Sequence, residues 1–411
     1  MSAGKWLLPF LCHAAAALVA CPSHAHVLHS ARVSARAPVV AVEDGKPAPS
    51  RGGVRLLEWI PSQQLLVTSA RFAWNTLWKV MLSELAPQSD DGDYVRPAPQ
   101  MGTGATWPAE LPVVSGRYHL YLGNACPWCH RVAASARLRQ QLLAKTGPPQ
   151  PTQFLSFTRL VSDPQRASRG GWVFDSDDPD PLCDAADLKG VYDRCTPGGY
   201  SGRCTAPLLV DLETSTIISQ ESADIIRMLG QVSLNPSGRA VDLYPTALRA
   251  DIDATCKWVY TQVNNGVYGC GFATTQSAYE RAERGVHEGL SRCDELLSSQ
   301  RFLCGAQITE ADVWLLPTAV RFDGIYASFF RCGRRQIRSD YPNIARWMKE
   351  LLQLTGSDLF DLDAARRSYY TDLFPLNPGG IVPSGPSAAD LGFPVGDGPV
   401  EDATAFSWRS V

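Results

Sequence analysis

The apolar residues of the stretch 117–122 recur at every second position, which predicts a β-strand with one face in a core. A Gly-Asn pair follows the stretch and favours a turn. Pro127 suits the first position of a helix, because its missing N–H would be unpaired there in any case. We therefore expect a strand, a turn and a helix over 127–144, with Cys126 at the start of the helix.

The following residues continue this alternation of strands and helices. We expect further strands near 154–161, 207–211 and 216–219, and a closing helix near 222–229. A long insertion rich in Asp and Gly, 162–199, separates the second strand from the third. Together these elements predict a small α/β domain over residues 113–232.

Residues 245–353 lack strand-like alternation and show helical periodicity instead. The long apolar patterns cover 248–263, 278–297 and 310–330. They predict an all-helical domain over 245–375. Thr309 and Asp312 have the spacing of a capping box at the start of the last pattern, so we expect Asp312 to stabilise this domain rather than to take part in chemistry.

The N-terminus has the pattern of a targeting segment. Lys5 precedes an apolar run over 6–20, and the residues after it are rich in Ser, Ala, Arg and Val, with no acidic residue before Glu43. An apolar signal followed by a basic, acid-free stretch is similar to the bipartite presequences of proteins imported into algal plastids. We expect residues 1–45 to be a presequence and the protein to be in the plastid (chloroplast). A secretory signal cleaved near Ala25, a simple transit peptide and a cytoplasmic location are the alternatives.

Two further segments flank the predicted domains. Residues 46–112 form an N-terminal extension, with a helix-like apolar pattern over 54–85 and a Pro/Gly-rich stretch over 86–112 that we expect to wrap the surface. The Gly/Pro-rich residues 376–411 predict an irregular tail.

Composition excludes several classes of protein. A chain of 411 residues with 45% hydrophobic residues is long enough for two cores. The net charge of -3 argues against a nucleic acid or a membrane surface as partner. The twelve cysteines are scattered and do not predict a disulfide framework in a chain of this size. We expect no metal, because a zinc site would need two further ligands near Cys126 and Cys129.

The chemistry of the chain centres on Cys126. At a helix start, free N–H groups and the helix dipole favour a thiolate over a thiol. A strand, a Cys-Pro-x-Cys turn and a helix are the redox signature of a thioredoxin-like fold. Cys129 lies one helical turn on, where it is either a resolving thiol or a small buried helix residue. His130 next to it is expected to be a packed histidine, although its ring could also favour a thiolate.

The chain resembles the glutathionyl-hydroquinone reductases, the xi class of glutathione transferases. The resemblance rests on ordered motifs from Tyr118 to Gly380: GNACPWCHR (123–131), GGWVFD (170–175), YSGRCTAPLLVD (200–211), QESADIIRML (220–229), VNNGVYGCGFATTQSAYE (263–280), TEADVWLLPTAVRFDGIY (309–326) and YPNIARW (341–347). It implies a thioredoxin-like N-terminal domain followed by an all-helical glutathione transferase domain, assembled as a homodimer. The variants CPWC, SRGGWVFD and GRCTAPLL look like the branch of this family in photosynthetic organisms.

The resemblance also implies site residues. Cys126 is the nucleophile, and Tyr268 and Tyr369 occupy the positions of tyrosines that lie over the quinol. Five positions match residues that contact glutathione: Trp172, Arg203, Ala206, Glu221 and Ser222. Pro207 matches the cis-proline of thioredoxin folds, and Ala206 stands where many members carry valine. Without the family, the tyrosines would be assigned to helix packing and Glu221-Ser222 to a helix cap.

The implied activity is the glutathione-dependent reduction of glutathionyl-hydroquinones, with glutathione as co-substrate and no metal. Cys126 would form a mixed disulfide with glutathione, and a second glutathione would release oxidised glutathione. Two alternatives stay open at this point. One is a glutaredoxin-like thiol transferase or dehydroascorbate reductase that uses Cys126 and Cys129, and the other is a non-catalytic carrier of glutathione or aromatic ligands.

Overall fold

The computed structural model describes residues 62–102, 104–144, 155–232 and 241–393. The predicted presequence 1–45 and the end of the predicted tail lie outside the described residues. Helix α2 (Gln63–Leu85) falls within the helix-like segment of the extension. In the described part of the chain, no helix is both long enough and apolar enough to cross a membrane.

A five-stranded mixed sheet forms the first domain. Its strands are β1 (Tyr118–Gly123), β2 (Leu155–Ser162), β3 (Trp172–Phe174), β4 (Leu208–Asp211) and β5 (Thr216–Ser219). Their order in the sheet is β3-β2-β1-β4-β5, with β1 parallel to β2 and antiparallel to β4. All residues of the central strand β1 are buried, as expected for a strand covered on both faces.

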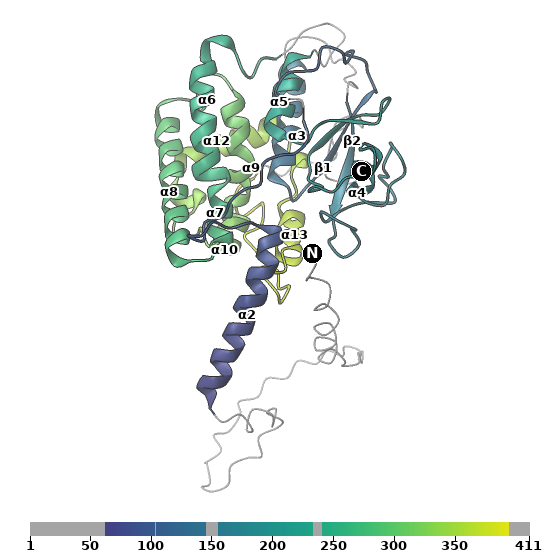
Figure 1. Ribbon diagram of the computed structural model, residues 1–411. Coiled ribbons are helices and arrows are strands. Elements are labelled where there is room, and N and C mark those ends of the chain that lie inside the picture. Colours follow the sequence, from purple (N-terminus) through teal and green to yellow (C-terminus); the bar gives the residue numbers. More distant parts are fainter. Residues whose placement is uncertain (1–61, 103, 145–154, 233–240, 394–411) are drawn as a thin grey trace, which may run out of the picture. The chain divides into compact units, whose positions relative to one another are not determined.

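Three helices cover this sheet. Helix α3 (Pro127–Ala144) makes the crossover between the parallel strands β1 and β2, and it lies on the same face as α5 (Ser222–Gln231). Helix α4 (Leu188–Arg194) lies on the opposite face (Figure 1). The insertion 162–199 thus contributes β3 and α4, and the three residues of β3 are too few to show a period of two in the sequence.

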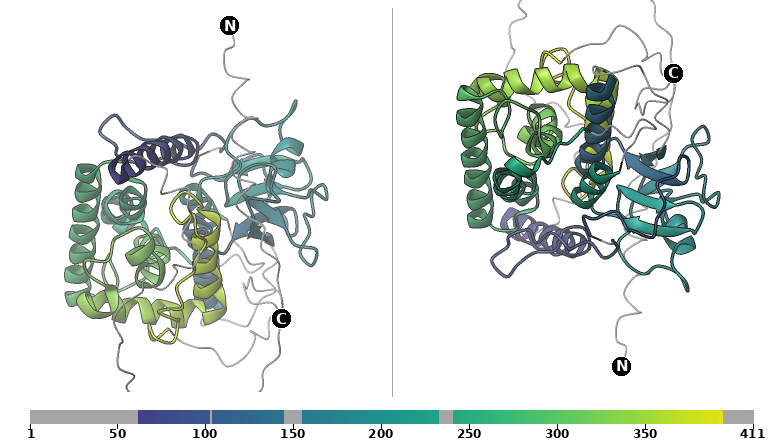
Figure 2. Two further views of the ribbon diagram at one scale, coloured as in Figure 1. Left: turned by 90° about the horizontal axis from the view of Figure 1, so that it is seen from below. Right: turned by 90° about the horizontal axis from the view of Figure 1, so that it is seen from above.

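Helices alone build the second domain. They are α6 (Arg249–Trp258), α7 (Gly266–Phe272), α8 (Gln276–Ser299), α9 (Glu310–Arg321), α10 (Ala327–Phe329), α11 (Ile337–Asp340), α12 (Pro342–Thr355) and α13 (Leu362–Asp372), with π-helical stretches η4 (Val259–Asn264) and η5 (Phe322–Tyr326). Views along the bundle show α3 between the sheet and these helices, and α3 packs on α9 and α12 (Figure 2). The predicted fold class, a thioredoxin-like domain followed by an all-helical domain, is confirmed.

Asp312 joins three parts of the helical domain. The fully buried carboxylate accepts hydrogen bonds from the N–H of Thr309 (2.9 Å), the N–H of Leu303 (3.0 Å) and the indole Nε1 of Trp347 (2.9 Å). The first of these contacts belongs to the predicted capping box at the start of α9. Asp312 therefore ties the start of α9 to the preceding loop and to α12.

Replacing Asp312 with alanine is expected to lower the free energy of unfolding by about 3 kcal/mol or more. Four buried donors lose their acceptor, because the hydroxyl of Thr309 (3.2 Å) also donates to this carboxylate. Urea unfolding followed by tryptophan fluorescence measures the change. Asp312→Asn keeps an acceptor oxygen and should lose less. An unchanged unfolding midpoint for Asp312→Ala would contradict the structural role.

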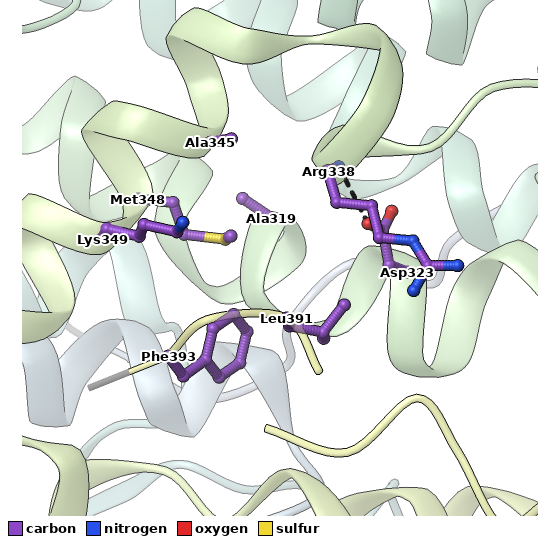
Figure 3. A pocket seen from close by; sticks show the side chains of 8 residues that line it. All are labelled: Ala319, Asp323, Arg338, Ala345, Met348, Lys349, Leu391 and Phe393. Carbon is purple, nitrogen blue, oxygen red and sulfur yellow. Dashed lines mark hydrogen bonds between the residues drawn. The ribbon is translucent and has the colours of Figure 1, made fainter. Parts of the chain in front are cut away.

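The described part of the tail packs on the helical domain without forming a helix or strand. Leu391 and Phe393 are buried and close a cavity of about 50 Å³ beside Ala319 and Met348 (Figure 3). A space of this size holds one or two water molecules, so it is a packing gap rather than a ligand site.

Candidate active site

Cys126 sits in the turn between β1 and α3. Its N–H donates to the carbonyl of Gly123 (3.1 Å), and its own carbonyl accepts the N–H of His130 (3.1 Å), which begins the helix. The Sγ atom accepts the N–H of Cys129 (3.3 Å) and lies 3.4 Å from the carbonyl oxygen of Ala206. Cys126 is 9% exposed, so little of the residue is open to solvent.

The surroundings of Cys126 favour the thiolate. Burial raises the pKa of its thiol. Hydrogen bonds from the side chain and N–H of Cys129, the charge of Arg321 and the N–H of Trp128 lower that pKa. The lowering contributions are larger, so the pKa of Cys126 lies below the ordinary value of a thiol. Cys129 is fully buried, and burial together with the hydrogen bond to Cys126 raises the pKa of its thiol. Of the two cysteines, Cys126 is therefore the one whose surroundings favour the thiolate, and Cys129 is the one that keeps its proton more readily.

Arg321 supplies a buried positive charge next to this turn. Its guanidinium donates to the carbonyl oxygens of Asn124 (2.7 Å) and Pro317 (3.0 Å) and to Nδ1 of His130 (3.0 Å). No carboxylate among the described residues forms an ion pair with it. Burial and the charge of Arg321 lower the pKa of His130 well below its ordinary value, so His130 is a packed, neutral histidine. The positive charge that favours the thiolate comes from Arg321, which the sequence did not single out.

The two predicted tyrosines meet in one hydrogen-bonded cluster. The hydroxyl of Tyr369, on α13, lies 2.8 Å from that of Tyr268 on α7 and 3.0 Å from that of Tyr326. Tyr326 ends the π-helical stretch η5, a backbone irregularity that is frequent at functional sites. Tyr326 lies in the motif 309–326, but its position in the sequence predicts no role for it.

These phenols are uncharged at neutral pH. Burial raises the pKa of Tyr268, Tyr326 and Tyr369, so each keeps a proton to donate. The negative charge of Cys126 also raises the pKa of Tyr369, which shows that the two groups are close enough to interact. The ring of Tyr268 stacks on Trp128, two residues after the nucleophile, at 6.4 Å between centroids.

A cleft of about 380 Å³ lies beside Cys126, since it is lined by Ala206, whose carbonyl oxygen is 3.4 Å from Cys126 Sγ. Four of the five predicted glutathione contacts line it: Arg203, Ala206, Glu221 and Ser222. The peptide bond between Ala206 and Pro207 is cis, as predicted. The volume is in the range of pockets that bind small ligands.

The start of α5 forms one end of the cleft. Glu221 is the N-cap residue, and its carboxylate accepts the N–H of Ala223 (3.1 Å) and the hydroxyl of Ser222 (3.2 Å). The buried guanidinium of Arg131 donates to the same hydroxyl (3.1 Å). The helix cap and the candidate binding site are therefore the same residues, and this end offers both a carboxylate and N–H donors.

Trp172, the fifth predicted contact, lies elsewhere. Its ring covers Gly123, where an added Cβ would approach it to 2.3 Å. It lines a second cleft of about 410 Å³ together with Asn124, Ala125 and Arg367 of α13. The structure thus brings Arg203, Ala206, Glu221 and Ser222 together in one cleft, and Trp172 lines the second cleft.

Comparisons with known proteins agree with this architecture. A family model described as the glutathione S-transferase C-terminal domain matches residues 276–350. Glutathionyl-hydroquinone reductase YqjG of Escherichia coli (strain K12) is 39% identical over 275 residues, which cover 66% of this chain and 79% of that protein. Glutathionyl-hydroquinone reductase PcpF of Sphingobium chlorophenolicum is 37% identical over 304 residues, with 73% and 92% covered.

Solved structures give the same result. The glutathione S-transferase Xi from Phanerochaete chrysosporium superposes with a TM-score of 0.63 at 37% identity, covering 73% of this chain and 94% of that one. The glutathione-bound structure of YqjG gives a TM-score of 0.60 at 35% identity, with 69% and 90% covered.

Fold and site define a glutathione-dependent oxidoreductase of the glutathione transferase superfamily, with cysteine at the start of α3. Within that superfamily, the chain belongs to the glutathionyl-hydroquinone reductases, the xi class of glutathione transferases. The resemblance stated from the motifs is confirmed. The assignment to the branch in photosynthetic organisms stays a prediction.

Proposed function

We propose that this protein reduces glutathionyl-hydroquinones to hydroquinones, with glutathione as the reductant and a Cys126–glutathione mixed disulfide as the intermediate. The observation that carries the proposal is the position of Cys126. Ala206, whose carbonyl oxygen lies 3.4 Å from Cys126 Sγ, lines the cleft with the other candidate glutathione contacts. Trp128, two residues after Cys126, stacks on Tyr268 of the cluster of neutral phenols. A thiolate alone, or a glutathione cleft alone, would not favour a glutathionyl-hydroquinone as the substrate.

The cleft supplies groups for each part of glutathione. The backbone of Ala206 faces the cysteinyl part, because its carbonyl lies beside Cys126 Sγ. Ser222 and the N–H groups at the start of α5 take the γ-glutamyl carboxylate, and Glu221 takes the γ-glutamyl ammonium. Arg203 at the rim takes the glycyl carboxylate.

In the first step, the Cys126 thiolate attacks the sulfur that joins glutathione to the ring. The S–S bond forms as the C–S bond breaks, and the electron pair of the broken bond stays with the ring carbon. The ring carbon takes up a proton, and the resulting hydroquinone leaves the site. Because carbon is a poor leaving group from sulfur, Tyr268 and Tyr369 donate hydrogen bonds to the ring oxygens and supply the proton.

In the second step, the thiolate of another glutathione attacks the glutathione sulfur of the mixed disulfide. Oxidised glutathione leaves, and Cys126 returns to the thiolate, whose low pKa makes it a good leaving group. In sum, one glutathionyl-hydroquinone and one glutathione give one hydroquinone and one oxidised glutathione.

A second candidate is a glutaredoxin-like thiol transferase or dehydroascorbate reductase. The hydrogen bond between Cys129 and Cys126 supports it, because Cys129 is placed to attack a mixed disulfide and release glutathione. The third candidate, a non-catalytic carrier, needs the cleft and the aromatic residues but no thiolate.

Turnover assays separate these functions. Glutathionyl-1,4-hydroquinone is incubated with the full chain and glutathione, and hydroquinone and oxidised glutathione are quantified by chromatography. The proposal expects both products in a 1:1 ratio. Turnover restricted to hydroxyethyl disulfide or dehydroascorbate would support the second candidate, and binding without any turnover would support the carrier.

Removing one phenol tests the proton donor. Tyr268→Phe is expected to slow hydroquinone release by about 10- to 100-fold, because the ring oxygen loses a hydrogen-bond donor. Reduction of hydroxyethyl disulfide, which has no ring to protonate, should change little. Tyr279→Phe is the matched control, since that hydroxyl bonds to the carbonyl of Arg331 (2.8 Å). Equal rates for Tyr268→Phe and wild type would remove Tyr268 from the mechanism.

The presequence 1–45 supports a plastid location, and the family supports a homodimer. Both are proposals that rest on the sequence.

A further inference from the structure

A segment of the N-terminal extension crosses the mouth of the glutathione cleft. We name residues 86–102 the strap. One end is held by the helical domain: the N–H of Thr274 donates to the carbonyl of Gly92 (3.0 Å), and the hydroxyl of Thr275 donates to the carbonyl of Asp91 (2.8 Å). Gly92 has a φ of +84°, and an added Cβ would lie 2.6 Å from Thr274 Oγ1, so this anchor requires glycine.

The other end of the strap is held by the sheet. Gly102 forms an antiparallel bridge with Ser219 at the end of β5, and the carbonyl of Met101 accepts the N–H of Gln220 (3.4 Å). Gln100 accepts the hydroxyl of Tyr200 (2.9 Å). The strap is therefore fixed to both domains, and the residues between its anchors span the cleft.

The span between the anchors forms one wall of the cleft. Its lining residues are Tyr94, Arg96, Pro97, Ala98, Pro99 and Gln100. The two prolines restrict the backbone to an extended conformation, which keeps the span from folding back on itself. The wall therefore holds its side chains at fixed positions over the cleft.

Arg96 is the cation that the strap brings to this wall. Its guanidinium carbon lies 4.2 Å from the ring centroid of Trp128, and the guanidinium of Arg131 lies 4.7 Å from the same ring. Arg96 also interacts electrostatically with Glu221. Among the described residues, no carboxylate forms an ion pair with Arg96. A guanidinium held on an aromatic face, beside a cleft and without an ion-paired carboxylate among the described residues, is suited to an anionic ligand.

We propose that Arg96 binds the α-carboxylate of the γ-glutamyl residue of glutathione, so that the strap is part of the glutathione site. The inference rests on the proposed function, in which glutathione occupies this cleft. Arg96 and Arg131 lie on the same ring of Trp128, and Arg131 bonds to Ser222, so Arg96 lies near the Glu221–Ser222 end of the cleft. There Arg96 pairs with the γ-glutamyl carboxylate while Glu221 pairs with the ammonium. In this assignment, Arg203 binds the glycyl carboxylate of glutathione.

Binding of reduced glutathione to the full chain, measured by calorimetry, tests this assignment. Arg96→Gln is expected to weaken binding by about 10- to 100-fold, the effect of one lost charge-assisted hydrogen bond or pair of bonds. Arg96→Lys should recover part of the loss, since it keeps the charge without the planar fork. Arg71→Gln, on the exposed surface of α2, is the matched control and should bind like wild type.

Two analogues show which carboxylate Arg96 binds. With 4-aminobutanoyl-Cys-Gly, which lacks the γ-glutamyl carboxylate, wild type and Arg96→Gln should bind equally weakly. With the glycyl ethyl ester of glutathione, Arg96→Gln should lose as much affinity as it does with glutathione. A loss that persists with the first analogue, or vanishes with the ester, would overturn the assignment.

Wild-type binding separates a failure of this inference from a failure of the proposed function. If wild type binds glutathione and Arg96→Gln binds equally well with an unchanged melting temperature, only the role of Arg96 is wrong. If wild type binds no glutathione, both the inference and the proposed function are wrong.

Discussion

Cys126→Ser is expected to reduce hydroquinone release by about 10³-fold or more, because the variant lacks the nucleophile of the first step. A serine hydroxyl is far less acidic than a thiol, so the hydrogen bonds from Cys129 and the charge of Arg321 do not ionise it at neutral pH. Single-turnover assays with glutathionyl-1,4-hydroquinone measure the loss. Mass spectrometry should find a glutathione adduct on wild type and none on the variant.

Two controls define what such a loss means. Cys126→Ser should still bind glutathione, since Arg203, Glu221 and Ser222 are unchanged. Cys129→Ala removes one donor to the thiolate and should slow the reaction by about tenfold without stopping it. Full activity of Cys126→Ser would contradict the thiolate mechanism. Loss of all hydroquinone release in Cys129→Ala would show that an internal disulfide is required.

The sequence predicted the elements that are set by local patterns. The period-two stretch before Cys126 and the helix-initiating Pro127 gave β1 and α3, and the observed helix covers the predicted range 127–144. The capping box at Asp312 was also local, because its partners are three residues apart. Such features depend on backbone conformation over a few residues, so a single sequence contains them.

The residues that the sequence missed act across long separations. Arg321 reaches the carbonyl of a residue 197 positions earlier, and Tyr326 joins Tyr369 only because α13 packs on η5. Arg321 also ends a largely apolar helix, where the pattern alone does not predict a buried cation. Arg96 was hidden in a Pro/Gly-rich stretch whose function depends on where its two ends are anchored.

Trp172 is a predicted glutathione contact that lines a different cleft from the other four, and its role stays a prediction. The family match placed it with the glutathione contacts, and the ring does lie close to the turn that holds Cys126. It packs on Gly123 and, with Arg367 of α13, lines the second cleft. A motif gives the position of a residue in the chain, whereas the cleft that it lines depends on how β3 pairs with β2.

Arg321→Gln is expected to make Cys126 about tenfold less reactive near neutral pH. The positive charge of Arg321 lowers the pKa of the Cys126 thiol, so its removal raises that pKa and shrinks the thiolate fraction. Rates of alkylation by iodoacetamide, followed from pH 5 to pH 10, measure this shift. The difference should be largest at acidic and neutral pH and should vanish at high pH, where the thiol ionises in both proteins.

Controls must separate the charge of Arg321 from its packing. Arg321→Lys keeps the charge and should retain most of the low-pH reactivity, even though the fork to Asn124 and His130 is lost. Arg292→Gln removes a charge that stacks on Trp258 and should leave the profile unchanged. Among the described residues Arg321 has no carboxylate partner, so its replacement breaks no ion pair there, and the buried charge itself carries a desolvation cost. A large loss of stability with an unshifted alkylation profile would therefore mean that Arg321 holds the turn in place and does not support the thiolate.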